Sequence, residues 1–251
     1  MGRVRAFLGM LLIAAGAGWV SAADEPLDAA MILEQVRAGW RGESFHALVE
    51  IEITVSGTTR RHLVEVWTCG EDRALIRIVE PEAEAGSGYL QLGDALWYYS
   101  PALGTAIALP AMGLTQALFG AGPSLGDLAQ GTLSRDHDVQ AEAVTGADGA
   151  LVGYLLTLLP RLGAPVVYGK LEVTVTADYV LSKIVYYDQR GAVLRTAAFE
   201  EVVRIGEILF PTKVVVVDAN GDRAVQQILD PEFGIALDPS FFTVERLEAG
   251  E

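Results

Sequence analysis

Short runs in which apolar and polar residues alternate are the feature of this chain that most constrains its fold. Between residues 47 and 55 every second side chain is apolar: Ala47, Val49, Ile51, Ile53 and Val55. A period of two places successive side chains on opposite faces of a β-strand. Further alternating or apolar runs, separated by turn residues, occupy 63–67, 74–79, 89–92, 95–99, 151–159, 171–175, 180–187, 193–203, 209–211, 214–217 and 224–229. We therefore predict a mainly β protein, built as an antiparallel meander with one dry and one wet face.

Two dipeptides between these runs carry a hairpin signal. Gly93-Asp94 separates two short apolar runs, and Asn220-Gly221 follows the run that ends at Val217. Both dipeptides are typical of type I′ turns, in which two consecutive residues adopt positive φ angles. We expect each of them to join two neighbouring antiparallel strands.

The segment before the first alternating run has a helical period instead. Its apolar residues stand at helix-compatible spacing: Leu27, Ala30, Met31, Leu33, Val36 and Trp40. Gly39 and Gly42 end the pattern. We predict one amphipathic helix over residues 26–40 that plugs or flanks the sheet.

Residues 1–23 have the pattern of a secretory signal peptide. Two arginines precede an apolar run from Ala6 to Val20, and Ser21-Ala22-Ala23 supplies a cleavage site of small residues. The apolar run is shorter than the roughly 20 residues that span a bilayer. We predict an exported protein with no stable membrane span after cleavage, in which residues 24–251 form a single domain.

Charge and cysteine content exclude several classes of partner and cross-link. The formal net charge is −15 at pH 7, and loss of the two signal-peptide arginines would make it −17. Such a surface repels the phosphates of nucleic acids and anionic lipid headgroups, so neither is an expected partner. With a single cysteine, Cys69, no intramolecular disulfide can form. A hydrophobic content of 51% must therefore supply stability through a large core.

The segment after residue 109 breaks the strand pattern. Pro110 is followed by apolar residues of mixed helical spacing that glycines interrupt: Met112, Leu114, Leu118 and Phe119. We expect short helical pieces here in place of a strand. A weakly packed apolar segment across a sheet is what a lid over a cavity requires, and it is also what an ordinary connection looks like.

A series of motifs around this segment follows a recognisable order. It comprises Arg77-Ile78-x-x-x-Pro81, Gly88-x-Leu90, Gly93-Asp94-x-Leu96-Trp97-x-Tyr99-x-Pro101, Gly120 with Ser124 and Asp127-Leu128, Gly191-x-x-x-Arg195-Thr196, and Pro211. In their order and spacing these motifs resemble the LolA-like family of periplasmic outer-membrane lipoprotein-sorting proteins. Relatives usually carry acidic and aromatic side chains in the segment that corresponds to residues 120–128, and this chain has mostly lost them.

The resemblance implies both a fold and a function. Family members form an incomplete antiparallel β-barrel around an apolar cavity, covered by short lid helices, and they carry acyl chains. For this chain it implies a non-enzymatic periplasmic carrier of lipid or lipoprotein acyl chains. Outer-membrane lipoprotein sorting or lipid export would be its role, and an inner-membrane exporter complex would be a partner. The residues expected to line or cover the cavity are Leu96, Trp97, Tyr99, Leu114, Leu118 and Phe119.

Two other functions fit parts of the sequence. The same fold serves envelope sensors that detect mislocalised lipoproteins, and a second C-terminal domain would favour that function.

A lipid hydrolase is the other alternative. Gly122-Pro123-Ser124-Leu125-Gly126 matches the nucleophile elbow of lipid hydrolases, which requires a strand before the serine and a distant histidine after it. Residues 114–121 do not have a strand pattern, and His137 follows Ser124 by only thirteen residues. We interpret Ser124 as a helix N-cap, with Asp127 on the first turn.

No cofactor or metal site is expected. The three histidines have no partners at metal-ligand spacing, and Cys69 stands seven residues after His62, on the opposite face of one strand. Asp136 and Asp138 flank His137, and we interpret these three residues as an exposed polar turn rather than a cation site. Cys69 is interpreted as a free structural thiol, because the acidic residues beside it oppose its ionisation.

Overall fold

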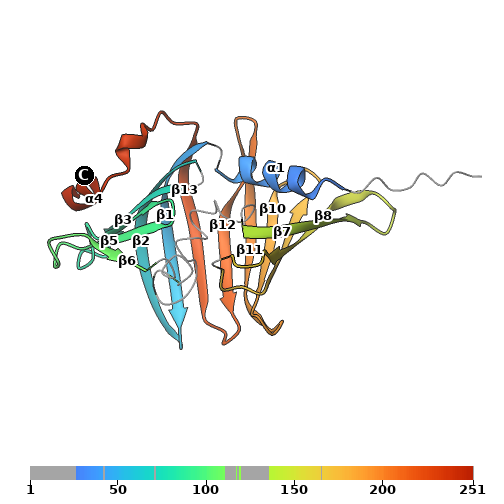
Figure 1. Ribbon diagram of the computed structural model, residues 1–251, viewed down its shortest axis with the longest axis horizontal. Coiled ribbons are helices and arrows are strands. Elements are labelled where there is room, and N and C mark those ends of the chain that lie inside the picture. The colour runs from blue at the N-terminus through green and yellow to red at the C-terminus, as the bar shows by residue number, and fades with distance from the viewer. Residues whose placement is uncertain are drawn as a thin grey trace, which may run out of the picture.

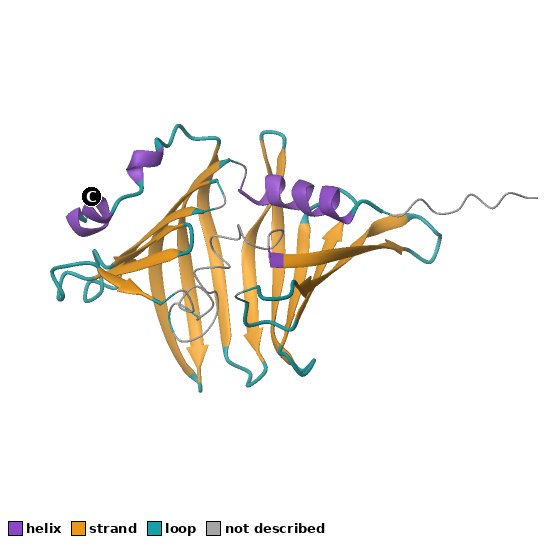
Figure 2. Ribbon diagram, in the orientation of Figure 1, coloured by secondary structure: helices purple, strands orange, loops and turns teal. Residues whose placement is uncertain are grey.

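The computed structural model describes residues 27–41, 43–70, 72–110, 117, 119, 136–164 and 166–250, apart from the side chains of residues 40 and 41. In this part of the chain a single antiparallel sheet dominates, and the helices lie at its margins (Figure 2). The predicted signal peptide, Leu114, Leu118, Ser124 and the predicted lid helices lie outside the described residues.

The elements follow the alternating runs of the sequence closely. The strands are β1 Ser44–Val55, β2 Thr58–Cys69, β3 Arg73–Glu80, β4 Gly88–Leu92, β5 Ala95–Tyr99, β6 Ile107–Leu109, β7 His137–Thr145, β8 Leu151–Pro160, β9 Lys170–Thr176, β10 Leu181–Tyr187, β11 Val193–Ile205, β12 Ile208–Asp218 and β13 Arg223–Phe233. The described helical elements are α1 Ala29–Arg41, the short 3₁₀-helix η2 Pro239–Phe241, and α4 Val244–Ala249. The sequence pattern did not predict α4, although Thr243 caps it by accepting a hydrogen bond from the Arg246 amide.

The strands form one 13-stranded sheet in the order β6-β5-β4-β3-β2-β1-β13-β12-β11-β10-β9-β8-β7. Two meanders, β1–β6 and β7–β13, are joined where β1 pairs antiparallel with β13, which places Val49 opposite Ile228. β6 and β7 stand at the two ends of this order, so the described strands do not close into a full barrel. The incomplete antiparallel β-barrel is thus confirmed. Residues 110–136 connect its two ends.

The turn at Gly93-Asp94 differs from the predicted type. Leu92 pairs with Ala95, so the two-residue hairpin is present, but only Gly93 has a positive φ, of 58°. Glycine with a positive φ followed by a residue outside that region is the pattern of a type II′ turn. A hairpin with positive φ at both loop residues, the type I′ signature, occurs instead at Ser56 and Gly57.

The turn at Asn220-Gly221 also departs from type I′. Only Gly221 has a positive φ, of 90°, and its N–H donates to the carbonyl of Asp218 at 2.9 Å. This is a type I turn closed by a left-handed glycine, a common three-residue hairpin loop. The hairpin between β12 and β13 is as predicted, and only its loop geometry was wrong.

Helix α1 lies across one end of the sheet, against β7 and β12 (Figure 1). Its buried side chains Ile32, Leu33 and Val36 lie on one face. Leu27 and Met31, which the pattern also placed on the apolar stripe, are 40% and 44% exposed. The predicted helix is confirmed, but its buried stripe is narrower than the sequence indicated.

The two faces of the sheet pack against different parts of the chain. We call the side that carries Val49 of β1, Leu156 of β8 and Ile184 of β10 the inner face, and the opposite side the outer face. These three side chains belong to one buried cluster together with Ile32, Leu33 and Val36 of α1. The main core therefore lies between the inner face and α1.

Candidate functional site

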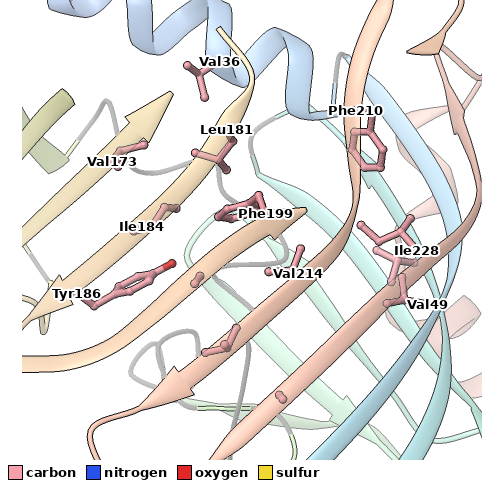
Figure 3. Packing of buried hydrophobic residues seen from close by; sticks show 14 of the residues in the cluster. Val36, Val49, Val173, Leu181, Ile184, Tyr186, Phe199, Phe210, Val214 and Ile228 are labelled. Carbon is pink, nitrogen blue, oxygen red and sulfur yellow. The ribbon is translucent and has the colours of Figure 1, made fainter. Parts of the chain in front are cut away.

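The inner face is lined by apolar side chains from most strands of the sheet. Figure 3 shows Val49, Val173, Ile184, Phe199, Val214 and Ile228 projecting toward a common space, with Val36 of α1 at its margin. β1 and β10 are separated by three strands in the sheet, yet both contribute to this one cluster because the sheet curls. An apolar face of this kind is suited to alkyl chains, since each methylene withdrawn from water contributes about 0.8 kcal/mol.

His62 is an exception to the apolar character of the inner face. It lies opposite Ile51 in the pairing of β2 with β1, and its side chain is buried. Its ring stacks on Phe119 with 4.1 Å between ring centroids and 19° between ring planes. Its Nε2 stands 3.4 Å from Oε2 of Glu84, which belongs to the turn between β3 and β4. The inner face therefore carries an imidazole between an aromatic ring and a half-exposed carboxylate.

Two tyrosines add hydroxyl groups near the same margin of the sheet. Tyr89 of β4 and Tyr98 of β5 pair across the strands, with their ring centroids 5.0 Å apart. Burial raises the pKa of Tyr89 to about 12, and the neighbouring Tyr98 and the Glu84 carboxylate act in the same direction. Tyr89 therefore stays protonated at any physiological pH and can donate a hydrogen bond.

A second polar group on the inner face is centred on Arg195 of β11. The side chain is only 7% exposed and its Nη2 donates to the hydroxyl of Tyr168. Its guanidinium also lies over the ring of Tyr186, 4.2 Å from the centroid. Aromatic faces stabilise a cation in such surroundings, so these tyrosines help to accommodate a buried positive charge.

The outer face carries a separate apolar cluster under the C-terminal segment. Leu75, Leu90, Phe242 and Leu247 are buried in it, and Trp67, Trp97, Tyr99 and Phe241 pack against it. Figure 1 shows this segment, with α4, beside β3 to β5. Phe241 and Phe242 therefore pack the C-terminal segment back onto the sheet.

Polar contacts also fix α4 to the sheet. The Glu248 carboxylate accepts hydrogen bonds from the Ala106 amide at 2.7 Å and from the Thr105 hydroxyl at 3.2 Å. Arg77 of β3 donates from Nη2 to the carbonyl of Arg246 at 3.1 Å. Thr105 and Ala106 directly precede β6, so the C-terminal helix positions the edge strand from which residues 110–136 depart.

A groove of about 610 Å³ lies on the outer face, where β13, β1 and β2 adjoin. Its lining comprises Glu50, Ile51, Glu52, Arg61, His62, Leu63, Glu80, Val225 and Gln227. Most of these are the outward residues of their strands, and Arg61 is paired with Glu52 at 2.8 Å. The groove is mainly polar, so it does not offer the surface that an alkyl chain needs.

The structure separates the residues that the sequence grouped as a lipid site. Leu96 lies in the inner-face cluster, and Phe119 packs against that cluster. Trp97 and Tyr99 lie in the outer-face cluster. Adjacent residues of a strand point to opposite faces, and this geometry places Leu96 and Trp97 on different sides of β5. His62 and Arg195 were not among the predicted site residues, because only the fold shows that they lie on the inner face.

The structure also places the histidine and cysteine residues that the sequence analysis considered for metal binding or redox chemistry. His137 is buried where it pairs with Pro160 in the ladder of β7 and β8, so the exposed polar turn predicted there is wrong. Cys69 is a free cysteine in the outer-face cluster, on the opposite face from His62 as predicted. In the described part of the chain no three His, Cys, Asp or Glu residues are grouped so that they could hold a metal ion. None of the described helices is both long and apolar enough to cross a membrane.

Comparison with known proteins agrees with this architecture. A family model described as "Uncharacterized protein" matches residues 70–249, so the chain belongs to that family. The crystal structure of a LolA superfamily protein from Nitrosomonas europaea has 25% sequence identity and a TM-score of 0.74. The match covers 87% of this chain and 99% of that one. The chain is a LolA-like protein.

Two further structures share the fold of this LolA-like protein at lower identity. A putative outer membrane lipoprotein-sorting protein domain from Vibrio parahaemolyticus has 17% identity and a TM-score of 0.74, covering 88% of this chain and 98% of that one. A DUF1329 family protein from Desulfovibrio piger has 17% identity and a TM-score of 0.78, covering 87% and 97%. No curated protein matches the sequence.

Proposed function

We propose that this LolA-like protein is a periplasmic carrier that holds the acyl chains of a lipid or lipoprotein against the inner face of its open sheet. The observation that carries the proposal is the continuous apolar lining of that face, drawn from strands on both meanders. The proposed role of this binding is outer-membrane lipoprotein sorting or lipid export. No catalytic step is part of the proposal.

The free energy gained by burying an acyl chain is compatible with reversible binding. A sixteen-carbon chain offers on the order of 10 kcal/mol of gross transfer free energy when it leaves water. Ordering the chain and moving the protein groups that cover the site reduce this figure. An open sheet can therefore hold such a chain firmly while still releasing it to an acceptor.

Within the predicted lipid site, we assign ligand contact to Leu96, and we assign Phe119 to the cover that a ligand must displace. Both belong to the inner face or pack against it. Leu114 and Leu118 remain proposed cover residues in the segment that joins the two ends of the sheet. Trp97 and Tyr99 lie on the outer face, and we assign them to the support of the C-terminal segment.

Location and partners are also part of the proposal. The predicted signal peptide over residues 1–23 supports export to the periplasm. A net charge of −15 favours a partner whose contact surface is basic, and an inner-membrane exporter complex is the class of partner proposed.

A matched pair of leucines tests the proposal. Leu96 on the inner face is 2% exposed, and Leu90 on the outer face of the neighbouring strand is 0% exposed. Leu96→Ala should weaken binding of a fluorescent sixteen-carbon fatty acid by about tenfold, because contacts to the chain are lost. Leu90→Ala should destabilise the fold similarly, by about 2–5 kcal/mol, without changing the affinity. Equal losses of affinity in both variants, or no binding by the wild type, would count against the proposal.

A further inference from the structure

His62 has a buried polar atom whose presence on the inner face requires an explanation. The residue is 6% exposed, and its Nδ1 has no hydrogen-bond partner within the described structure. A buried polar atom without a partner costs about 1–3 kcal/mol, and such atoms are rare in folded proteins. An apolar residue at this position would avoid that cost.

The neighbouring carboxylate determines what Nδ1 can do. Oε2 of Glu84 lies 3.4 Å from Nε2 of His62. A carboxylate beside one ring nitrogen favours the proton on that nitrogen, and in the neutral imidazole the other nitrogen is then an acceptor. Nδ1 is thus prepared to receive a hydrogen bond from a donor that the described chain does not supply.

Phe119 covers one face of the imidazole ring of His62. Its ring stacks on the imidazole at 4.1 Å, so withdrawal of Phe119 would uncover His62. Around it the inner face is apolar, with Ile51 opposite His62 on β1. A ligand lying beside His62 on this face would meet an apolar surface with one hydrogen-bond acceptor, Nδ1, in the plane of the imidazole ring.

We propose that Nδ1 of His62 accepts a hydrogen bond from the polar end of the acyl ligand. The ligand class is an alkyl chain joined to a group with an N–H or O–H donor, such as an N-acyl amide or a hydroxylated lipid. This assignment rests on the proposed acyl-binding function and specifies the ligand of that same site. His62 contributes selectivity, while the apolar lining contributes most of the affinity.

An amide and ester pair tests the assignment. N-methylhexadecanamide and methyl hexadecanoate have the same chain and nearly the same shape, but only the amide has an N–H. Affinities of the mature protein for both are measured by displacement of N-phenyl-1-naphthylamine. His62→Phe keeps an aromatic ring against Phe119 and removes the acceptor. It should weaken amide binding by about fivefold, and leave ester binding within about twofold.

A second variant covers the case in which His62→Phe fails to fold. Glu84 is half exposed, so Glu84→Gln leaves the core intact while removing the charge that keeps the proton on Nε2. The ratio of amide to ester affinity should fall in this variant too. Tyr186→Phe removes a hydroxyl group from a different part of the inner face and serves as the control. Its ratio of amide to ester affinity should equal that of the wild type.

The outcomes separate the two proposals. If neither compound displaces the probe from the wild type, the acyl-binding function itself fails. If both bind but His62→Phe and Glu84→Gln leave their ratio unchanged, only the assignment to His62 fails. The same displacement assay with hexadecanoate is a third measurement. If His62→Phe weakens binding of hexadecanoate and leaves binding of the amide unchanged, His62 acts as a cation toward an anion and the acceptor assignment is wrong.

Discussion

The rings of His62 and Phe119 stack face to face with 4.1 Å between their centroids. His62 belongs to β2 in the first meander, and Phe119 belongs to the segment between β6 and β7. The contact therefore places Phe119 against the inner face. A ligand that lies on this part of the inner face must compete with Phe119.

Removal of the Phe119 ring should reveal that competition. Phe119→Ala should bind a fluorescent fatty acid several-fold more tightly, because the stacking contact of about 0.5–1.5 kcal/mol no longer opposes the ligand. The dissociation constant from a fluorescence titration is the measurement. Phe241→Ala, which removes a partly buried ring from the outer-face cluster, is the control and should not tighten binding. A weaker affinity of Phe119→Ala would show that Phe119 holds the ligand instead of competing with it.

The contact of Glu248 with Ala106 should govern the local stability of the edge strand β6. Glu248→Ala removes the acceptor of the Ala106 amide, which the structure places at 2.7 Å. Hydrogen exchange of that amide should accelerate by about tenfold, corresponding to the loss of roughly one hydrogen bond to a charged group. Glu245→Ala, in the first turn of the same helix, should leave the exchange of Ala106 unchanged. An unaltered rate in Glu248→Ala would mean that α4 does not restrain β6.

His46 on the outer face should make stability depend on pH. Burial alone would lower its pKa, but hydrogen bonds to Glu65 at 2.8 Å and Glu232 at 3.1 Å outweigh that effect and raise the pKa above 6.5. A raised pKa in the folded state stabilises the protein fully below the unfolded value, and the contribution is lost as pH rises through the folded value.

His46→Gln should therefore lower the free energy of unfolding more at about pH 5.5 than at about pH 8.5. Urea denaturation of the wild type and the variant at both pH values measures the difference. Glu232→Gln weakens one of the two contacts and should show a smaller effect of the same sign. A loss that is equal at both pH values would contradict the assigned pKa shift.

We expect that Ser124, in the nucleophile-elbow motif, does not catalyse ester hydrolysis. The mature protein and Ser124→Ala should cleave a fluorogenic acyl ester at the same rate, equal to the rate in buffer. A faster wild-type reaction that Ser124→Ala abolishes would establish a hydrolase and overturn the carrier proposal.

The strands were predictable because their signal is local. The alternation from Ala47 to Val55 reflects the faces that these residues occupy, and the same holds for the run from Leu171 to Val175. The type of turn was less predictable, because Gly93-Asp94 is compatible with more than one loop that needs a positive φ at glycine. The pairing of β1 with β13 depends on residues about 180 positions apart, which no local period encodes.

The candidate site was only partly predictable for the same reason. Alternation requires Leu96 and Trp97 to face opposite sides, but it does not say which side encloses the ligand. That choice depends on α1 packing on one face and the C-terminal segment on the other. His62 could not be recognised from its neighbours in sequence, because Glu84 and Phe119 reach it through the fold.

The most direct test of the carrier account is native mass spectrometry of the mature protein purified from the periplasm, followed by solvent extraction and identification of the lipids. We predict a mass increment from a bound acylated species at near-stoichiometric level, and its loss in Leu96→Ala. A protein that is purified empty, and that stays empty after incubation with phospholipid and acylated peptide, would contradict the central claim that the inner face holds acyl chains.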